Sequence, residues 1–248
     1  DITLSTGLRI TRFMLYGPYK ESLYNNFGQA IDLRIYNDNE LVTNYTNPEP
    51  RLGINYKLND KSSIKISYAR LFQYIQNIYN TNTPLPTSRW KISDRYISPQ
   101  KNDTYGLGYY KNFPNSFIEL SLESYYRDTK NNLTYKPGAD FFLSEFIERE
   151  ITQVQGRSYG VELSLKKTLG QFNGVLNYSW SRSLLKSNEI NPQYKINNNN
   201  WFNSDFDRPH TVNLSINFEN DKYNSFSFNF VGQSGRPYTI ANGIFEKQ

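Results

Sequence analysis

The sequence predicts an all-β fold: a transmembrane antiparallel β-barrel, present only in part, with about nine strands. Apolar and polar residues alternate with a period of two along most of the chain. Short and long connections join the alternating segments in turn. Aromatic residues form 16% of the chain although only 37% of its residues are hydrophobic. This combination is typical of strands with one apolar face and one wet face.

Nine segments carry the alternation, and in each of them most positions of one parity are apolar. These segments are residues 2–10, 52–58, 64–74, 105–109, 118–122, 159–165, 172–180, 212–218 and 226–230. The intervening positions are polar, as Glu119, Ser121 and Glu123 illustrate. Faces of such different chemistry suit a sheet that meets lipid on one side and water on the other.

The connections differ in length at the two ends of the predicted strands. Short ones near residues 59–62, 112–116, 169–171 and 220–224 contain the Asn, Asp, Gly and Pro that tight hairpins require. Long ones lie near residues 17–44, 77–98, 131–149 and 187–204. Short periplasmic turns and long extracellular loops are the plan of an outer-membrane barrel. Within the third long loop, residues 141–150 predict a short helical turn.

Aromatic residues gather near both ends of the predicted strands. Those beside the short turns are Phe113, Phe117, Phe172, Phe218 and Phe226, and those toward the long loops are Tyr16, Tyr74, Tyr126, Tyr159 and Trp180. Aromatic rings favour the membrane–water interface, and transmembrane barrels carry two such girdles. A soluble β-sandwich also alternates, but it needs a dry interior and uses shorter strands than the roughly 10–14 residues expected here. The pattern therefore favours the membrane.

The composition narrows the possible chemistry. The chain has no Cys, which excludes disulfides and thiolate metal sites, and its one His, His210, makes His-based zinc sites and most His-dependent triads hard to build. We therefore expect no cofactor and no metal site. The net charge of +5 is spread along the chain without a Lys/Arg block, so we expect no nucleic-acid partner. No run approaches the roughly 18 apolar residues of a membrane helix.

Six motifs resemble, in their order and spacing, the barrel of bacterial TonB-dependent receptors, particularly those of Bacteroidota. They are EPRLGINYKLNDKSSIKISYARLFQYIQ (49–76), SPQKNDTYGLGYYKNF (98–113), QGRSYGVELSLKK (155–167), LNYSWSRS (176–183), FDRPHTVNLSINF (206–218) and FSFNFVGQSGRPYT (226–239). The resemblance covers most of the chain from about residue 45 onward.

The resemblance implies a barrel of 22 strands in the bacterial outer membrane, with an N-terminal plug domain inside it. It implies import of a scarce ligand, such as an iron chelate, a vitamin, an oligosaccharide or a peptide, with energy relayed by the TonB protein. The implied partners are outer-membrane lipid and TonB, which would act through a plug region that these residues do not contain. A surface lipoprotein that caps the barrel is a further candidate partner.

Three departures from the family pattern predict that residues 1–248 are an internal and late portion, the C-terminal barrel part, of a longer receptor. The sequence contains no plug domain and no TonB-interacting segment. About nine strands cannot close a barrel of 22. The sequence reads Phe245-Glu246-Lys247-Gln248 at its end, without the terminal aromatic residue that such barrels carry. It also begins directly on a strand pattern, without a secretory signal.

Four residues in the long loops are the candidate ligand-binding residues: Arg89, Trp90, Trp201 and Phe202. Arg and Trp are favoured anchors in binding sites, and aromatic faces suit sugars and other ringed ligands. The alternative is that these side chains pack the loops together or lie at the outer lipid interface.

No catalytic residue is expected, and the chain is not predicted to be an enzyme. Glu119 and Glu123 share the wet face, where we expect them to pair with Lys or Arg on adjacent strands. His210 is the only histidine available to a Ser–His arrangement. It closes the motif DRPH, in which Asp207 and Arg208 are expected to pair at the outer rim. Besides import and a barrel enzyme, a third hypothesis is a non-transporting barrel subunit of a larger surface complex.

Overall fold

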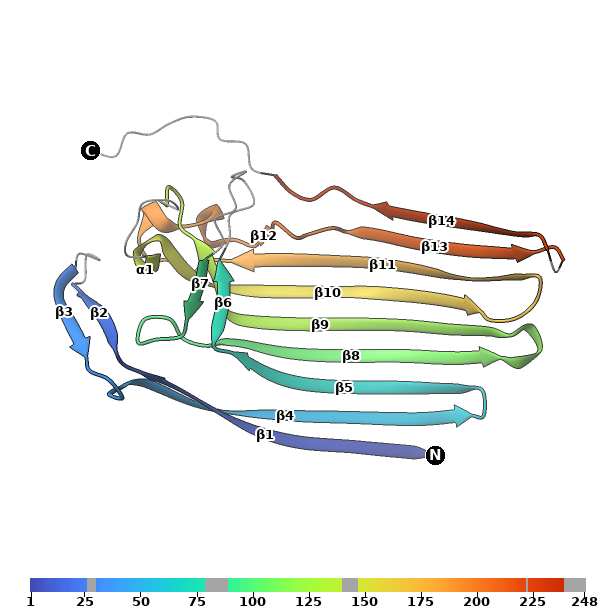
Figure 1. Cartoon of the computed structure of the whole chain (residues 1–248), viewed down its shortest axis with the longest axis horizontal. Coiled ribbons are helices and arrows are strands. Elements are labelled where there is room, and N and C mark those ends of the chain that lie inside the picture. The colour runs from blue at the N-terminus through green and yellow to red at the C-terminus, as the bar shows by residue number, and fades with distance from the viewer. Residues whose placement is uncertain (26–29, 79–88, 140–146, 222, 239–248) are drawn as a thin grey trace.

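The computed structural model describes residues 1–25, 30–78, 89–139, 147–221 and 223–238 (Figure 1). Residues 141–146 of the predicted helical turn lie outside the described residues, and so does the end at 245–248. Residues 147–150 form the short helix α1 (Ile147–Glu150), where the sequence predicted helix.

One long antiparallel sheet forms most of the molecule, and its strands follow one another in chain order (Figure 1). The strands along it are β1 (Ile2–Tyr16), β4 (Leu41–Asn59), β5 (Ser62–Gln73), β8 (Gln100–Phe113), β9 (Ile118–Tyr135), β10 (Ile151–Lys167), β11 (Phe172–Lys186), β13 (His210–Glu219) and β14 (Ser225–Gln233). The short strand β12 (Phe202–Asn203) also pairs with β11. Each predicted segment lies in one of the nine long strands, except that Tyr74 follows the end of β5. The predicted fold class is therefore confirmed, as an open part of a barrel.

The apolar side chains of the main sheet are exposed. The exposed fraction is 70% for Ile2, 53% for Leu107 and 57% for Phe228. A soluble sandwich would bury these residues against a second sheet, whereas in the described part of the chain only two small hairpins accompany the main sheet. The sandwich alternative is therefore wrong, and the apolar face is one that lipid would cover. Among the described residues, none of the helices has the length and apolarity needed to span a bilayer.

The opposite face of the sheet is polar and carries hydrogen bonds between strands. The Ser164 hydroxyl donates to Asn177 over 2.7 Å, and the Ser227 hydroxyl donates to Asn217 over 2.8 Å. On the same face the Lys166 ammonium lies 3.7 Å from the Glu119 carboxylate. The expected pairing with a cation on an adjacent strand is thus confirmed for Glu119 but wrong for Glu123, which lies opposite Glu162 in register. We call this side the wet face and the apolar side the outward face.

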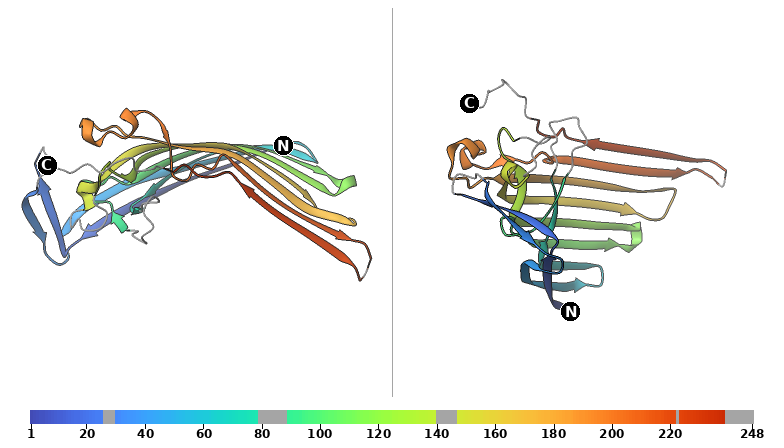
Figure 2. Two further views of the ribbon diagram at one scale, coloured as in Figure 1. Left: turned by 90° about the horizontal axis from the view of Figure 1, so that it is seen from above. Right: turned by 60° about the vertical axis from the view of Figure 1, so that its left-hand side comes forward.

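The long connections contain structure that the sequence did not predict. The first holds the hairpin of β2 (Tyr19–Tyr24) and β3 (Ala30–Tyr36), and the second holds that of β6 (Ile75–Ile78) and β7 (Arg89–Ile92). The fourth holds 3₁₀ turns at Pro192–Tyr194 and Asn197–Asn199. In Figure 2 the hairpin β6–β7 lies on the concave side of the sheet, and the 3₁₀ turns lie on the convex side. Pairing within these hairpins satisfies backbone groups that would otherwise need water.

A small apolar core lies at the long-loop end. Ile78, Ile97 and Ile151 are buried there, and Leu133, Tyr135 and Ile147 pack against them. The Gln76 side chain adds two hydrogen bonds to β9, one to the carbonyl of Asn131 and one from the amide of Leu133, both 3.1 Å. These contacts hold hairpin β6–β7 against the ends of β9 and β10.

Aromatic rings form a band across neighbouring strands on the outward face. Tyr68, Tyr105, Tyr126 and Tyr159 face one another in register on β5, β8, β9 and β10. Ring centroids of Tyr68 and Tyr105 are 5.1 Å apart, and those of Tyr159 and Trp180 are 6.0 Å apart. Three of these residues were predicted for the outer girdle: Tyr126, Tyr159 and Trp180.

Tyr74 does not continue the apolar parity of β5, although the sequence predicted that it would. β5 ends at Gln73, so the alternation stops before this residue. The Tyr74 ring stacks on Phe13 at 5.0 Å, and its hydroxyl lies 2.7 Å from that of Thr11. On β1, Arg9 and Thr11 alternate with the apolar positions and therefore lie on the wet face. Tyr74, which contacts Thr11, thus lies over the wet face as well.

Candidate functional site at the long-loop end

The structure places Arg89 and Trp90 at the start of β7, opposite Ile78 and Asn77 of β6. They were predicted in a loop and instead begin a strand of a hairpin. The exposed fraction of Trp90 is 68%, which leaves its ring open to a ligand or a partner.

Trp201 and Phe202 lie on opposite sides of the same short segment. Phe202 pairs with Leu185 of β11 and lines a cavity on the wet face. The ring of Trp201 lies beneath the Arg157 guanidinium, with 4.2 Å between the guanidinium carbon and the ring centroid. On β10, Arg157 has the same parity as the apolar Val161, so it lies on the outward face. Trp201, which contacts Arg157, therefore lies on the outward face too. Strand alternation thus separates two residues that the sequence grouped as one candidate pair.

The cavity beside Phe202, here called the rim pocket, has a volume of about 340 Å³. Its lining includes Asn102, Arg127, Thr129, Ser158 and Ser183 from four adjacent strands. The Thr129 hydroxyl donates to Asn102 over 2.8 Å, and Arg127 donates to the Thr104 hydroxyl over 3.3 Å. The rim pocket therefore offers a guanidinium, hydroxyls and amides to a polar ligand. Arg127 has the same strand parity as Glu119 and Glu123, which the sequence places on the wet face. That parity could have identified Arg127 as a candidate binding residue.

A second cavity, of about 400 Å³, lies between β3, the start of β4 and the segment after β7. Arg34, Arg95, Tyr36 and Tyr45 line it, and we call it the arginine pocket. The Arg34 guanidinium lies 4.8 Å from the centre of the Tyr36 ring. Burial, and then the hydrogen bond to the Glu21 carboxylate, raise the pKa of Tyr36, so its hydroxyl stays a neutral donor. The Tyr36 and Tyr45 hydroxyls donate within the protein, to Glu21 and to the carbonyl of Asp94, so the two guanidinium groups are what suits an anionic, oxygen-rich ligand. Sequence patterns did not predict this pocket.

A cluster of charged side chains, with Lys91 and Asp94 buried and Glu148 half-buried, joins three of the long connections. The Lys91 ammonium lies 2.8 Å from the Asp94 carboxylate and 3.4 Å from that of Glu148. The Tyr24 hydroxyl donates to Glu148 over 3.1 Å, and the Tyr19 hydroxyl donates to Asp94 over 3.4 Å. We call these five residues the loop clasp. It ties hairpin β2–β3, hairpin β6–β7 and helix α1 into one unit.

The electrostatics of the loop clasp keep Lys91 charged. Burial lowers the pKa of Lys91, but the carboxylates of Asp94 and Glu148 outweigh burial, and the pKa lies above its ordinary value. Burial, with the nearby carboxylates, raises the pKa of Tyr19 to about 12. At neutral pH Lys91 therefore stays protonated, and the two tyrosines of the clasp stay neutral donors.

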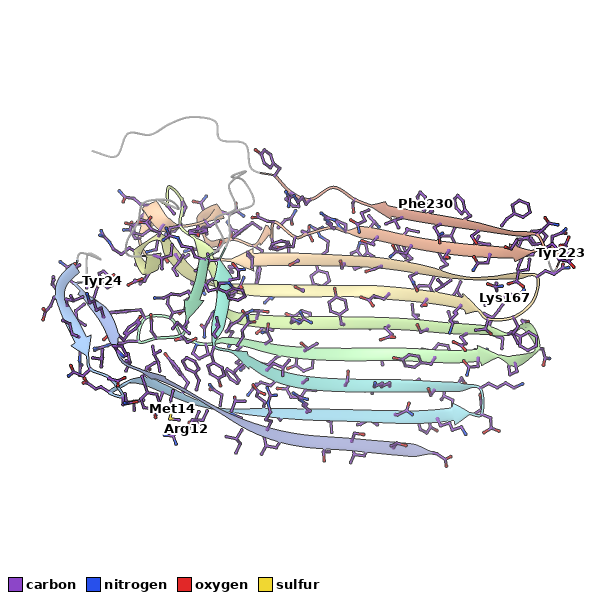
Figure 3. The ribbon with its side chains drawn as sticks, in the orientation of Figure 1. Arg12, Met14, Tyr24, Lys167, Tyr223 and Phe230 are labelled. Atoms are coloured by element: carbon purple, nitrogen blue, oxygen red, sulfur yellow. The ribbon has the colours of Figure 1, made fainter. Side chains whose placement is uncertain are left out.

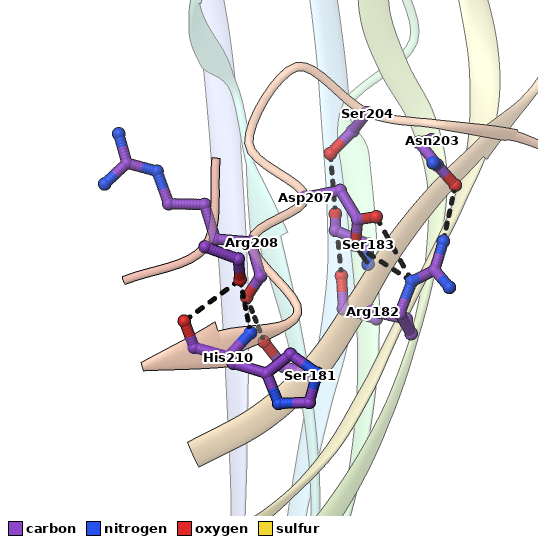
Figure 4. A network of polar contacts seen from close by, with 10 residues as sticks. Ser181, Arg182, Ser183, Asn203, Ser204, Asp207, Arg208 and His210 are labelled. Atoms are coloured by element: carbon purple, nitrogen blue, oxygen red, sulfur yellow. Dashed lines mark hydrogen bonds and ion pairs between the residues drawn. The ribbon is translucent and has the colours of Figure 1, made fainter. Parts of the chain in front are cut away.

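Asp207 of the DRPH motif is buried, and it pairs with Arg182 over 3.1 Å (Figure 4). The expected pair of Asp207 with Arg208 is wrong, because Arg208 donates to the side chain of Gln233. Asp207 also accepts a 2.7 Å hydrogen bond from the backbone amide of Ser183. That amide lies where β11 changes partner from β13 to β12, so the carboxylate replaces a missing ladder bond. The motif therefore completes the sheet.

Asp207→Ala should lower the free energy of unfolding by about 1–3 kcal/mol, because it leaves the half-buried Ser183 amide without an acceptor and removes the partner of Arg182. Urea unfolding of the full-length protein in detergent measures this loss. Asp38→Ala, at an exposed turn, is the control and should change stability very little. Equal stability of the two variants would contradict the bridging role.

His210 lies at the start of β13, and its ring nitrogen is 2.9 Å from the Tyr178 hydroxyl. The two rings stack with centroids 6.2 Å apart. Both residues belong to the outward parity, since Tyr178 pairs with Leu163. This places His210 in the aromatic band rather than in a cavity. Across the described residues, His, Asp and Glu side chains form no group of three placed to hold a metal ion.

Comparison with known proteins agrees with this architecture. A family model described as TonB dependent receptor-like, beta-barrel, matches residues 1–247. No curated protein sequence matches the chain. The FrpB iron transporter from Neisseria meningitidis is 13% identical, with a TM-score of 0.58 over 92% of this chain and 30% of that one. The ferric-catecholate import receptor Fiu from K12 E. coli is 13% identical, with a TM-score of 0.57 over 95% of this chain and 33% of that one.

The chain thus spans about a third of the length of these two proteins, and at this identity the likeness concerns the fold. The family match extends over almost the whole sequence and agrees with the exposed apolar face, the polar wet face and the one-sided loops. The family is one of transport receptors rather than enzymes, and its members lie in the bacterial outer membrane. The chain belongs to the TonB-dependent receptor-like β-barrel family.

Proposed function

We propose that this chain forms part of the wall and extracellular rim of an importer that carries a scarce ligand across the outer membrane. The ligand would be an iron chelate, a vitamin, an oligosaccharide or a peptide, and TonB would supply energy through a plug region outside these residues. The observation that carries the proposal is the two-faced sheet, which pairs an exposed apolar face with a polar face ending in cavities at the long loops.

Among these ligands we favour an anionic iron chelate. Arg34 and Arg95 supply two guanidinium groups to the arginine pocket, and Arg127 supplies a third to the rim pocket. Guanidinium groups bind carboxylate and catecholate oxygens through paired N–H donors. The iron transporter and the ferric-catecholate receptor among the similar structures are consistent with this choice. The sequence candidates Arg89, Trp90 and Phe202 remain proposed ligand contacts, whereas the position of Trp201 on the outward face fits the alternative, a residue at the outer lipid interface.

The double variant Arg34→Gln/Arg95→Gln should lower uptake of a ferric tris-catecholate at least tenfold at limiting concentration, because it removes both cations of the arginine pocket. Uptake by cells that produce the full-length protein is the measurement. Lys61→Gln, at an exposed short turn, is the matched control and should leave uptake unchanged. Trp90→Ala and Phe202→Ala, assayed in the same way, test the sequence candidates.

Normal uptake by a deletion strain of a ferric tris-catecholate, cobalamin, maltoheptaose and a peptide mixture would reject import. That result would favour the second candidate function, a non-transporting barrel subunit of a larger surface complex. One observation supports a protein partner at this end. Ile31, Leu33 and Ile35 of β3 lie exposed on one side of a hairpin at the long-loop end. A capping surface lipoprotein would fit this apolar stripe.

We also infer that the chain is the late part of a receptor barrel of the Bacteroidota type. The order of motifs between residues 49 and 239 supports this inference. In the described part of the chain β1 and β14 are the two outer strands of the main sheet, and their outer edges would then join the remaining strands of the same barrel. The coding sequence on either side of these residues tests it, because the inference requires a plug domain upstream.

A further inference from the structure

The outward face changes chemistry in a regular order along the strands. Aliphatic residues such as Ile66 and Leu107 occupy its middle. The aromatic band of Tyr68, Tyr105 and Tyr126 follows toward the long loops. Beyond this band, the same parity carries charged residues. The order is therefore apolar, aromatic and then charged, which is the order of environments from the membrane interior to its surface.

Five consecutive strands each place one cation just beyond the aromatic band. These residues, the cation row, are Arg70 on β5, Lys101 on β8, Lys130 on β9, Arg157 on β10 and Arg182 on β11. Lys101 and Lys130 lie opposite each other in register, and Arg182 lies opposite Tyr159. Adjacent strands are about 4.8 Å apart, so the row extends about 20 Å along the rim.

Carboxylates offset only part of this charge. Asp103 lies 2.7 Å from Arg70 and 3.1 Å from Lys101, so one carboxylate serves two cations. Asp207 pairs with Arg182, as described above. Asp128 lies opposite Arg157 in register.

At the centre of the cation row, positive charge exceeds negative charge. Within the described part of the chain, Lys130 and Arg157 form no ion pair within 4 Å, and both are exposed. Arg157 rests on the Trp201 ring, which holds its guanidinium at the outward face. The row therefore presents an excess of positive charge at its middle, with one of the two free cations already positioned.

We propose that the cation row binds the phosphate groups of the phosphorylated glycolipid of the outer leaflet, the lipid A type. Aromatic side chains settle at the membrane interface, so the cations one or two residue pairs beyond them lie at headgroup depth. Arg and Lys form charge-assisted hydrogen bonds to phosphate. The row lies at the long-loop, extracellular end, where the outer leaflet supplies the lipid. Ligand import plays no part in this site.

The test is the binding of monophosphoryl lipid A to the full-length protein in detergent, measured by native mass spectrometry. The variant is Lys130→Gln/Arg157→Gln, which neutralises the two cations without ion pairs. The matched control is Lys111→Gln/Lys167→Gln, which removes two cations of the same parity from the opposite ends of β8 and β10. Lys167 lies at the short-turn end of the sheet (Figure 3).

We expect the variant to bind lipid A at least tenfold more weakly, and the control to stay within about twofold of the unmodified protein. Lipid A stripped of phosphate should bind the unmodified protein as weakly as the variant binds the phosphorylated form. Arg157→Lys, which keeps the charge, should retain binding and shows that the site tolerates a changed side chain. Unchanged binding in the variant, equal loss in the control, or equal binding of the dephosphorylated lipid would overturn the proposal. Equally tight binding of phosphatidylglycerol would overturn its assignment to the glycolipid.

Discussion

Lys91→Met is expected to destabilise the long-loop end by about 3–5 kcal/mol while the membrane-spanning sheet stays intact. Methionine matches the length of lysine but carries no charge. The substitution leaves the buried carboxylate of Asp94 and the half-buried carboxylate of Glu148 without the cation that both contact. An unpaired buried charge costs more than the pair itself contributes. The hydroxyls of Tyr19 and Tyr24 cannot neutralise two carboxylates.

Hydrogen exchange of the full-length protein measures the effect by segment. Amides of hairpins β2–β3 and β6–β7 should exchange faster in the Lys91 variant, whereas those in the middle of β9 and β10 should not. Lys20→Met replaces an exposed lysine of the same hairpin region and is the control. If Lys91→Met and Lys20→Met exchanged alike, the loop clasp would not hold the connections together.

Leu214→Arg is expected to cost about 2–4 kcal/mol of folding free energy in a bilayer. Leu214 lies in the middle of β13 on the outward face, between Leu176 of β11 and Phe230 of β14 in register. A guanidinium at that position would have to be buried among lipid chains. Asn213→Arg should cost much less, because Asn213 faces Asn177 across the wet face.

Refolding of the two full-length variants into lipid vesicles at graded urea concentrations measures the difference. The pair is matched, because the two residues are neighbours and the introduced side chain is the same. Equal costs for the two substitutions would show that the faces have been assigned wrongly. A larger cost for Asn213→Arg would reverse the assignment.

The sheet was predictable because its cause is local in the sequence. Side chains of a strand point to alternate faces, so the run from Tyr159 to Leu165 already shows which residues share the outward face. The registered tyrosines Tyr126 and Tyr159 follow from the same alternation. Prediction failed at Tyr74, where β5 ends and the chain bends, since alternation has meaning only while the strand continues.

The candidate site was harder to predict because its contacts join distant segments. Arg89 and Trp90 were identified by residue type, and the structure places them in a hairpin. Trp201 and Phe202 were taken as a pair, yet they lie on opposite faces of the sheet. Residue type indicates what a side chain is able to bind, but not which neighbours it meets.

Alternation, turn composition and the lengths of connections were sufficient to establish the strands, their two faces and the end that carries the loops, because each is a property of consecutive residues. The loop clasp and the arginine pocket required the folded chain. Lys91 contacts Glu148 from another connection, and Arg34 and Arg95 line one cavity only because two connections pack together. Such contacts depend on how the strand ends bring the connections into one space, and no pattern of neighbouring residues encodes that path.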